Sequence, residues 1–271
     1  MNKIKGGKHI SAIVPVFNEE KTVKKVIEAL LKSNLISEVI SVNDGSTDKS
    51  LEILKSFGDK IKVINLKCNQ GKGFALAVGI KKAKGEIVAF FDSDLVNLSD
   101  EHVKTLLNPI LENKYKAVLG FPKRNKSFPN IFAYLTGERA YRRNGLFPHL
   151  EKIKKTRYGV ETFLNSLFDK KETKIMPLKS LIHLVKYEKV DPSRAFKEYL
   201  VEAVEIAKEM GRKEIISSKD YQKITDLTSV DNFNDLKQRI SKIKNKTIKK
   251  FLNKYVTKYL TSAKRIFRDF I

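Results

Sequence analysis

An apolar run that ends in two carboxylates is the feature that most restricts how this chain can fold. Residues 87–91 are all apolar, and Asp92-Ser93-Asp94 follows directly. A short continuous apolar run of this kind is typical of a fully buried strand. In α/β folds, ligands bind beyond the carboxyl ends of the strands, where this pair of carboxylates would lie. Asp92 and Asp94 therefore suit a divalent cation such as Mg²⁺, which takes one or two carboxylates together with substrate phosphates. A solvated turn that caps a helix is the alternative.

Strand and helix signals alternate through the first 120 residues. Continuous apolar runs predict strands at 9–17, 39–42, 61–66, 86–91 and 117–121. Apolar residues at helical spacing predict helices at 20–32, 48–57, 73–84 and 101–113. Strands that alternate with helices of this length favour crossover connections. The expected fold class is therefore α/β, with a mainly parallel sheet that is covered by helices on both faces.

The alternation stops after residue 121. The sequence predicts a basic loop at 122–130, a strand at 174–178, and helices at 131–145, 158–169 and 193–210. The polar residues 217–234 are the best candidate for a linker. We therefore expect an α/β domain at 1–216 with halves at 1–120 and 121–216, then this linker, then a helical extension at 235–271.

The charge of the chain predicts an anionic partner. Lys and Arg number 54 against 31 Asp and Glu, which leaves a net charge of +23. This excess suits phosphates, nucleic acid or an acidic membrane surface. A nucleic-acid-binding protein is the less favoured reading, because the chain has no recognition motif and no platform of alternating aromatic and basic residues.

The sequence predicts an amphipathic basic helix at the end of the chain. Their apolar stripe has helical spacing and comprises Ile248, Phe251, Leu252, Tyr255, Val256, Tyr259, Leu260, Ala263, Ile266, Phe267 and Phe270. Such a helix could pack on its own domain, pair with a second subunit in a homodimer, or lie on an anionic membrane surface. The basic face favours the membrane, since each Lys or Arg near an anionic surface adds ~1 kcal/mol. We expect peripheral attachment to the inner face of the membrane.

The single cysteine and the hydropathy of the chain predict a cytoplasmic location. Cys68 is the only cysteine, which excludes an intramolecular disulfide and fits a reducing compartment. No apolar run approaches the roughly 18 residues that a membrane-spanning helix needs. The first residues do not have the pattern of a signal peptide.

Four polar segments follow one another where a predicted strand gives way to a helix. They are Pro-Val-Phe-Asn-Glu-Glu at 15–20, Asn-Asp-Gly-Ser-Thr-Asp at 43–48, Asn-Gln-Gly-Lys-Gly at 69–73, and the Asp-Ser-Asp at 92–94. All four can line one rim of a parallel sheet. Gly71 and Gly73 would let the backbone approach a ligand, and Lys72 can place a point charge on a phosphate.

In this order, the four segments resemble the nucleotide-sugar-dependent glycosyltransferases of family 2, which have the Rossmann-like GT-A fold. The resemblance covers roughly residues 9–120. It implies a donor site whose residues contact the base, the ribose and the diphosphate: Pro15, Phe17, Glu19, Asp44, Ser46, Lys72, Asp92 and Ser93. It also implies an Asp-x-Asp motif in which Asp94 is the direct ligand of Mg²⁺ or Mn²⁺. Packing is the alternative role for Pro15 and Phe17.

Two later segments look like those of glucosyl-3-phosphoglycerate synthases and their bacterial relatives. They are Leu-Thr-Gly-Glu-Arg-Ala at 135–140 and Tyr-Gly-Val-Glu at 158–161. In that group, a histidine farther along the chain completes the metal site, and His183 is the candidate here. Polyprenyl-phosphate sugar synthases share the first motifs and remain close competitors. The loop at 122–126 and the basic tail depart from the phosphoglycerate enzymes.

The resemblance implies transfer of a hexose, with UDP-glucose as the first candidate donor, to a phosphorylated acceptor such as 3-phosphoglycerate or a lipid phosphate. Glu161 would position or deprotonate the acceptor hydroxyl, or it is a helix-start residue favoured by the helix dipole. Gly137 and Arg139 would bind the acceptor. Arg139, Arg142 and Arg143 would share one helix, either as an anion site or as a solvated basic face. A DNA-modifying glycosyltransferase would combine this chemistry with the basic charge.

Overall fold

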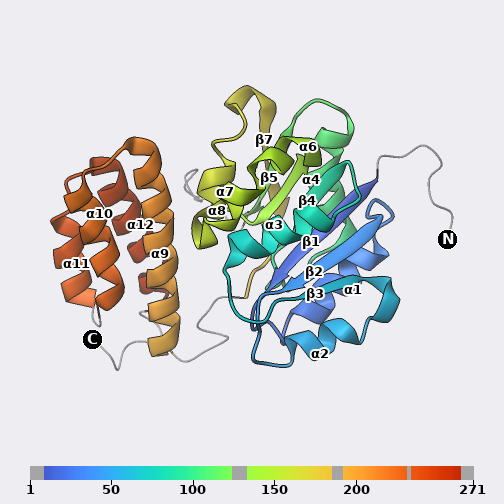
Figure 1. The fold of residues 1–271 in the computed structure, drawn as a ribbon, viewed down its shortest axis with the longest axis horizontal. Coiled ribbons are helices and arrows are strands. Elements are labelled where there is room, and N and C mark those ends of the chain that lie inside the picture. The colour runs from blue at the N-terminus through green and yellow to red at the C-terminus, as the bar shows by residue number, and fades with distance from the viewer. Residues whose placement is uncertain (1–8, 124–132, 185–191, 231–232, 264–271) are drawn as a thin grey trace. The chain divides into compact units, whose positions relative to one another are not determined.

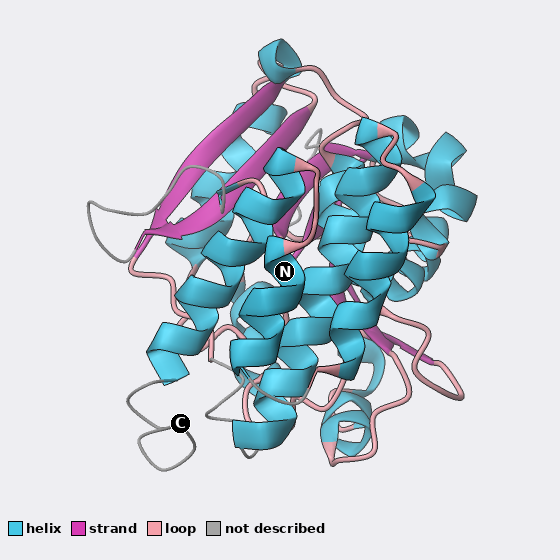
Figure 2. Cartoon of the chain, turned by 90° about the vertical axis from the view of Figure 1, so that its left-hand side faces the viewer, coloured by secondary structure: helices cyan, strands magenta, loops and turns pink. Residues whose placement is uncertain are grey.

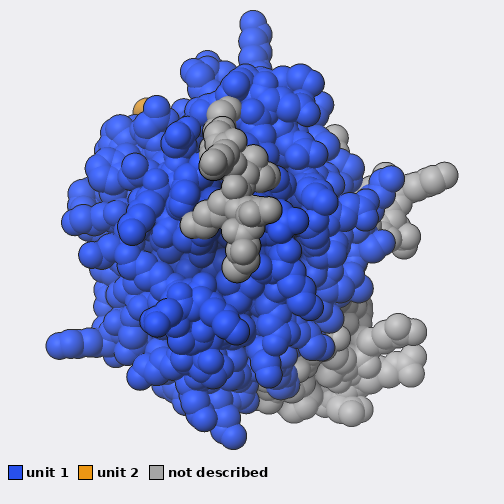
Figure 3. Space-filling view, turned by 90° about the vertical axis from the view of Figure 1, so that its right-hand side faces the viewer, with its two compact units in different colours: residues 1–184 blue, residues 185–271 orange. Residues whose placement is uncertain are grey.

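The computed structural model describes residues 9–123, 133–184, 192–230 and 233–263. It divides into two compact units, residues 1–184 (unit 1) and residues 185–271 (unit 2), which Figure 3 colours separately. The sequence-based division placed the boundary after residue 216 instead. The observed boundary comes earlier because the long helix that follows it packs with the helices of unit 2.

Unit 1 is built on a seven-stranded sheet (Figures 1 and 2) with the order β3-β2-β1-β4-β6-β5-β7. Its strands are β1 (Ile10–Val16), β2 (Glu38–Asn43), β3 (Lys62–Asn65), β4 (Ile87–Phe90), β5 (Ala117–Lys123), β6 (Glu138–Arg142) and β7 (Thr173–Lys179). β1 pairs in parallel with β2 and β4, β2 with β3, and β5 with β7. β6 runs antiparallel to both of its neighbours, β4 and β5. The predicted mainly parallel sheet is confirmed.

Helices cover both faces of this sheet (Figure 1). They are α1 (Val23–Lys32), α2 (Ser50–Lys55), α3 (Lys72–Lys82), α4 (Asp100–Leu111), α6 (Arg143–Leu146), α7 (Leu150–Lys154) and α8 (Val160–Leu164). Along β1, Ala12 and Val14 enter the core that contains α1 and α4, whereas Ile13 enters the core that contains α3 and α7. Successive side chains of a strand point to opposite faces of the sheet. Since both faces are buried, every residue of such a strand has to be apolar, which explains the continuous apolar runs in the sequence.

The helix predicted at 131–145 is wrong. Residues 131 and 132 lie outside the described residues, and Glu138–Arg142 forms β6 rather than a helix. Along β6, Ala140 enters one core and Tyr141 the other, which is the two-residue period of a strand. Pairing with β4 and β5 outweighed the weak helical spacing, as tertiary context often does. The helix predicted at 158–169 is also shorter, since α8 ends at Leu164.

Unit 2 is helical. It contains α9 (Pro192–Glu214), α10 (Ser218–Thr225), the 3₁₀ helix η6 (Asp226–Ser229), α11 (Phe233–Ser241) and α12 (Lys246–Ala263). The polar residues expected to form a linker therefore include α10 and η6. Their polar side chains serve helix ends: the Ser217 hydroxyl accepts a hydrogen bond from the Asp220 amide at 3.2 Å. The buried Asp220 carboxylate accepts hydrogen bonds from the amides of Lys244 and Asn245.

The apolar stripe of the tail lies in the core of unit 2 over its described part. Its buried side chains are Ile248, Phe251, Leu252, Tyr255 and Val256, and α12 packs against α9. Intradomain packing therefore accounts for this part of the stripe, which leaves it unavailable for the expected peripheral contact with a membrane. The stripe from Tyr259 onward lies beyond the described side chains. Within the described residues, no helix combines the length and hydropathy needed to span a membrane.

Phe251→Ala tests whether the apolar stripe of α12 forms part of the core of unit 2. Phe251 is 1% exposed, and removal of such a buried ring should lower the free energy of unfolding by about 3–5 kcal/mol. Chemical denaturation followed by circular dichroism measures the loss. The neighbouring exposed residue gives the control, since Lys250→Ala should change stability by no more than about 0.5 kcal/mol. Equal stability of the two variants would contradict the assignment.

Candidate functional site

The polar segments meet at one edge of the sheet. Asp44 follows β2, and Asp92 and Asp94 follow β4. Because β6 is antiparallel, its first residue, Glu138, lies at the same edge as the carboxyl end of β4; Phe90 pairs with Arg139. The segment after β7 adds His183, which forms an isolated bridge with Leu95. The edge therefore gathers acidic groups from different parts of the sequence.

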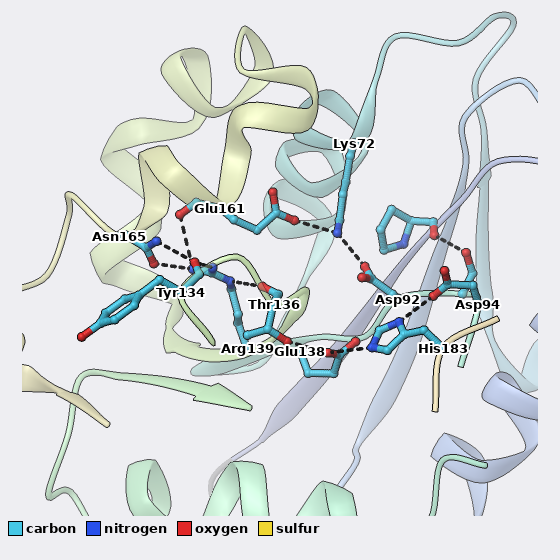
Figure 4. Close-up of polar contacts among 12 residues, drawn as sticks. Lys72, Asp92, Asp94, Tyr134, Thr136, Glu138, Arg139, Glu161, Asn165 and His183 are labelled. Atoms are coloured by element: carbon cyan, nitrogen blue, oxygen red, sulfur yellow. Dashed lines mark hydrogen bonds and ion pairs between the residues drawn. The ribbon is translucent and has the colours of Figure 1, made fainter. Parts of the chain in front are cut away.

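Lys72 links two of these carboxylates. It is the first residue of α3, and its Nζ lies 2.7 Å from Asp92 Oδ1 and 2.7 Å from Glu161 Oε1 (Figure 4). Burial opposes its charge, but the two carboxylates raise the pKa of Lys72 well above its usual value. The structure thus brings together three predicted site residues around one ammonium group.

The Asp92 carboxylate packs closely against Gly137. A Cβ at position 137 would overlap the Asp92 carboxylate, so the site tolerates only glycine there without a shift. Burial raises the pKa of Asp92 to about 6; Lys72 opposes this, and the charges of Glu138 and Asp94 add to it. Gly137 therefore has a role in placing Asp92, which its predicted role in acceptor binding did not include.

His183 lies between two carboxylates (Figure 4). Its Nδ1 is 3.0 Å from Asp94 Oδ1, and its Nε2 is 3.4 Å from Glu138 Oε2. Burial opposes protonation, but Glu138 and Asp94 raise the pKa of His183 well above its usual value. The backbone fixes this pairing, because the amide of Leu184 donates to the carbonyl of Asp94 at 2.8 Å. The two residues predicted as metal ligands are thus neighbours.

Glu138 is the site residue that sequence reasoning missed. Its side chain is fully buried, and Oε2 accepts a hydrogen bond from the Thr136 hydroxyl at 2.7 Å. Asp92, Glu138 and His183 each offer one ligand atom, and these atoms lie within 4.8 Å of one another. No local alternation marks residues 138–141 as a strand, because two polar residues, Glu138 and Arg139, precede two apolar ones, Ala140 and Tyr141. The incorrect helix concealed Glu138.

Arg139 is held by internal hydrogen bonds, and its predicted contact with the acceptor stays a prediction. Its side chain is buried and donates hydrogen bonds to the carbonyls of Thr136 and Tyr134, both at 2.6 Å. It also donates to the side chains of Asn165 at 2.8 Å and Tyr141 at 3.0 Å. Arg139 therefore ties the loop before β6 to the segment after α8. Since Arg139 lies on β6, it does not share a helix face with Arg142 or Arg143.

Asp44 organises the loop that leads into Lys72. Its carboxylate is buried; Oδ1 accepts from the Gln70 amide at 2.7 Å, and Oδ2 accepts from the Gly71 amide at 2.8 Å. Burial raises the pKa of Asp44, against the effect of these hydrogen bonds. Gly71 has φ of 95°, which favours glycine. A contact of Asp44 with a base or ribose stays a prediction.

The other predicted donor residues lie along the same edge. The Ser93 hydroxyl donates to the Pro15 carbonyl at 2.9 Å, which joins the segment after β4 to the end of β1. The Ser46 hydroxyl accepts from the Asn18 amide at 3.0 Å. The Glu19 carboxylate accepts from the hydroxyl of Thr22, and Phe17 is half-buried. These contacts shape the edge, and the donor-binding roles stay predictions.

Comparisons of sequence show similarity to known glycosyltransferases. The model of the family described as "Glycosyl transferase family 2" matches residues 11–174. Glycosyltransferase GlyG of Streptococcus pneumoniae is 32% identical over 134 residues, which is 48% of this chain and 44% of that protein. Glucosyl-3-phosphoglycerate synthase of Mycolicibacterium smegmatis is 32% identical over 130 residues, which is 44% of this chain and 42% of the synthase. The chain thus matches less than half the length of these relatives.

Solved structures of glucosyl-3-phosphoglycerate synthase from Mycobacterium tuberculosis have a similar fold. One, in complex with Mn²⁺, UDP and glucosyl-3-phosphoglycerate, has a TM-score of 0.62 at 25% identity and covers 79% of this chain and 82% of that chain. Another, with Mg²⁺ and UDP, has a TM-score of 0.59 at 26% identity over the same shares. These structures confirm the predicted GT-A fold. Since the family match spans more than half of its residues, the chain belongs to glycosyl transferase family 2.

Proposed function

We propose that unit 1 is a metal-dependent glycosyltransferase that moves a hexose, with glucose the first candidate, from a nucleoside diphosphate sugar to a phosphorylated acceptor. The observation that carries the proposal is the cluster at the sheet edge, where Lys72 contacts Asp92 and Glu161 while His183 contacts Asp94. In this cluster, Lys72 offers a positive charge for the diphosphate of a donor, and Asp94 and His183 offer ligand atoms for a metal ion. The UDP complexes of the similar synthases support this choice of donor.

The residues present fit Mg²⁺ or Mn²⁺. Asp94 and His183 offer an oxygen and a nitrogen 3.0 Å apart, and both side chains are about one quarter exposed. Both ions take carboxylate oxygens and keep positions for phosphate oxygens, and the softer imidazole donor suits Mn²⁺ better than Mg²⁺. When bound, the ion would neutralise the charge that develops on the departing diphosphate.

Lys72 would assist at the same phosphates. Its ammonium is held at the start of α3 and keeps its charge between two carboxylates. A diphosphate that reaches Lys72 would share this cation with Asp92 and Glu161, so donor binding changes the charge balance of the site. Glu161 is 7% exposed and follows the first residue of α8. We assign it to positioning or deprotonating the acceptor hydroxyl, with a purely helix-stabilising role as the alternative.

The acceptor class rests on the similar synthases, one of which was solved with UDP-glucose and phosphoglyceric acid. The loop at 122–126 departs from those enzymes in sequence; Pro122 and Lys123 end β5, and residues 124–126 lie outside the described residues. Arg139 is occupied by internal hydrogen bonds. We therefore propose a phosphorylated acceptor without choosing between 3-phosphoglycerate and a lipid phosphate. The family membership favours this function over nucleic-acid binding or DNA modification.

Removal of the metal ligands should abolish transfer. Asp94→Ala and His183→Ala each remove one donor of the proposed ion, and a chelator should have the same effect until Mn²⁺ is restored. Product formation from UDP-glucose, followed by mass spectrometry, measures this. His149→Ala is the matched control, because His149 lies in the 3₁₀ helix Phe147–His149 and its ring packs on Phe163 rather than on a proposed metal ligand. Full activity of Asp94→Ala, or activity in excess chelator, would contradict the metal assignment.

Lys72→Ala should weaken UDP binding in the presence of Mn²⁺ by about 10-fold or more, because a charged hydrogen bond contributes roughly 1.5–3 kcal/mol. Isothermal titration calorimetry measures the affinity. Lys81→Ala, which removes an exposed lysine from the same helix, should leave it unchanged. The donor site would be wrongly placed if both variants bound UDP like the unmodified chain, and the donor itself would be wrong if the unmodified chain bound neither UDP nor GDP.

We also propose a peripheral, electrostatic contact of unit 2 with anionic membranes. The apolar stripe is occupied, but Lys246, Lys250 and Lys254 are exposed on α12. Replacement of these three lysines by Gln should reduce co-sedimentation with phosphatidylserine vesicles at low salt. The same change at exposed lysines of unit 1, Lys24, Lys25 and Lys55, is the control. Equal co-sedimentation of both variants, or no co-sedimentation of the unmodified chain, would contradict the proposed membrane contact. Either result would favour a soluble acceptor or self-association.

A further inference from the structure

We propose that Glu138 is a positioning residue that fixes the imidazole of His183 for metal binding. In this arrangement, Glu138 accepts the hydrogen of His183 Nε2, and Nδ1 is left to bind the metal ion beside Asp94. The inference rests on the metal ion of the proposed function and adds a fully buried residue, Glu138, to that site. Figure 4 shows the imidazole between the two carboxylates.

The chemistry of a carboxylate determines the hydrogen on Nε2. Glu138 Oε2 lies 3.4 Å from His183 Nε2, and it already accepts a hydrogen bond from Thr136 at 2.7 Å. An ionised carboxylate can only accept, so in the metal-free chain Nε2 carries a hydrogen toward Glu138 and Nδ1 carries one toward Asp94. A histidine that binds a metal through one nitrogen commonly donates from the other to a carboxylate, which sets its tautomer and orientation.

Accessibility determines which nitrogen is left for the metal. The Asp94 side chain is 24% exposed and the His183 side chain 25%, whereas Glu138 is 0% exposed. An ion that enters from solvent therefore reaches Nδ1 and Asp94 Oδ1, which are 3.0 Å apart, before it reaches Glu138. An ion bound at Nδ1 would displace the hydrogen there to solvent, and the enclosed contact with Glu138 would keep the hydrogen on Nε2.

The position of Glu138 in the sheet suits this role. It is the first residue of β6 and pairs with Gly120 of β5, so its backbone is held by the sheet. Its second oxygen, Oε1, is buried and accepts no hydrogen bond from any residue that the structure describes. A buried carboxylate with an unused acceptor is costly for folding, which is expected of a group retained for function.

Manganese affinity provides the test. The free Mn²⁺ signal in electron paramagnetic resonance gives the dissociation constant for the full chain and for Glu138→Gln, Glu138→Leu and His183→Ala. Glu138→Leu removes the acceptor and should weaken binding by about 10–100-fold, close to His183→Ala. Glu138→Gln keeps an acceptor oxygen without the charge and should fall between Glu138→Leu and the unmodified chain. Melting temperatures of the metal-free proteins show that each variant is folded.

The tautomer of His183 gives a second readout that a purely structural role would not change. Nitrogen-15 NMR of the chain with Mg²⁺ should show a hydrogen on Nε2 alone, and Glu138→Gln, the isosteric variant, should show less of this tautomer. Wild-type affinity in Glu138→Leu, or an unchanged tautomer in Glu138→Gln, would overturn the role of Glu138 and leave the metal site intact. Failure of the unmodified chain to bind Mn²⁺ would instead refute the proposed metal itself.

Discussion

The site depends on one constraint: the negative charges of several carboxylates that lie close together have to be balanced by positive charges. Asp92, Asp94, Glu138 and Glu161 meet at one edge of the sheet, and only Lys72 and His183 contact them as cations among the ion pairs described here. Buried or half-buried charges of one sign are costly unless they are paired. Each cation therefore bridges two carboxylates. This arrangement explains why burial and neighbouring charges raise the pKa of Asp92 to about 6, and why a divalent cation would find a prepared site.

The backbone brings these charges together through one reversal of strand direction. β4 delivers Asp92 and Asp94 at its carboxyl end, and β6 delivers Glu138 at its amino end. Only an antiparallel β6 can put both ends at the same edge. The absence of a side chain at Gly137 then lets the Asp92 carboxylate approach the chain just before β6. Fold and site are thus coupled at the junction of β4 and β6.

Much of this arrangement could be predicted from the sequence, where local signals agree with the fold. The apolar run before Asp92 predicted β4, because a strand buried on both faces has to be continuously apolar. Position after that strand and the family resemblance placed Asp94 and His183 in one site, and they are neighbours. Glu138 could not be found in this way, because its importance depends on β6, whose pairing with distant strands outweighs local helical spacing.

The predicted linker at 217–234 differs from the structure for a related reason, because the prediction rested on polar composition. Residues 217–234 look like a linker because Ser217, Asp220 and their neighbours are polar, yet these side chains cap helices and hold the turn before α12. Composition alone does not distinguish a capping residue from a solvated one. In the same way, the amphipathic stripe of α12 predicts a buried face without identifying what covers it, and the structure assigns its described part to the core of unit 2.

A crystal structure of the full chain with Mn²⁺ and UDP tests the central claim most directly. Anomalous scattering at the manganese edge locates the ion independently of the protein coordinates. The account predicts one strong peak within bonding distance of Asp94 and His183 Nδ1, with the diphosphate of UDP between this ion and Lys72 and with Nε2 still directed at Glu138. UDP bound at the sheet edge without a manganese peak, or a peak that is ligated elsewhere, would contradict it.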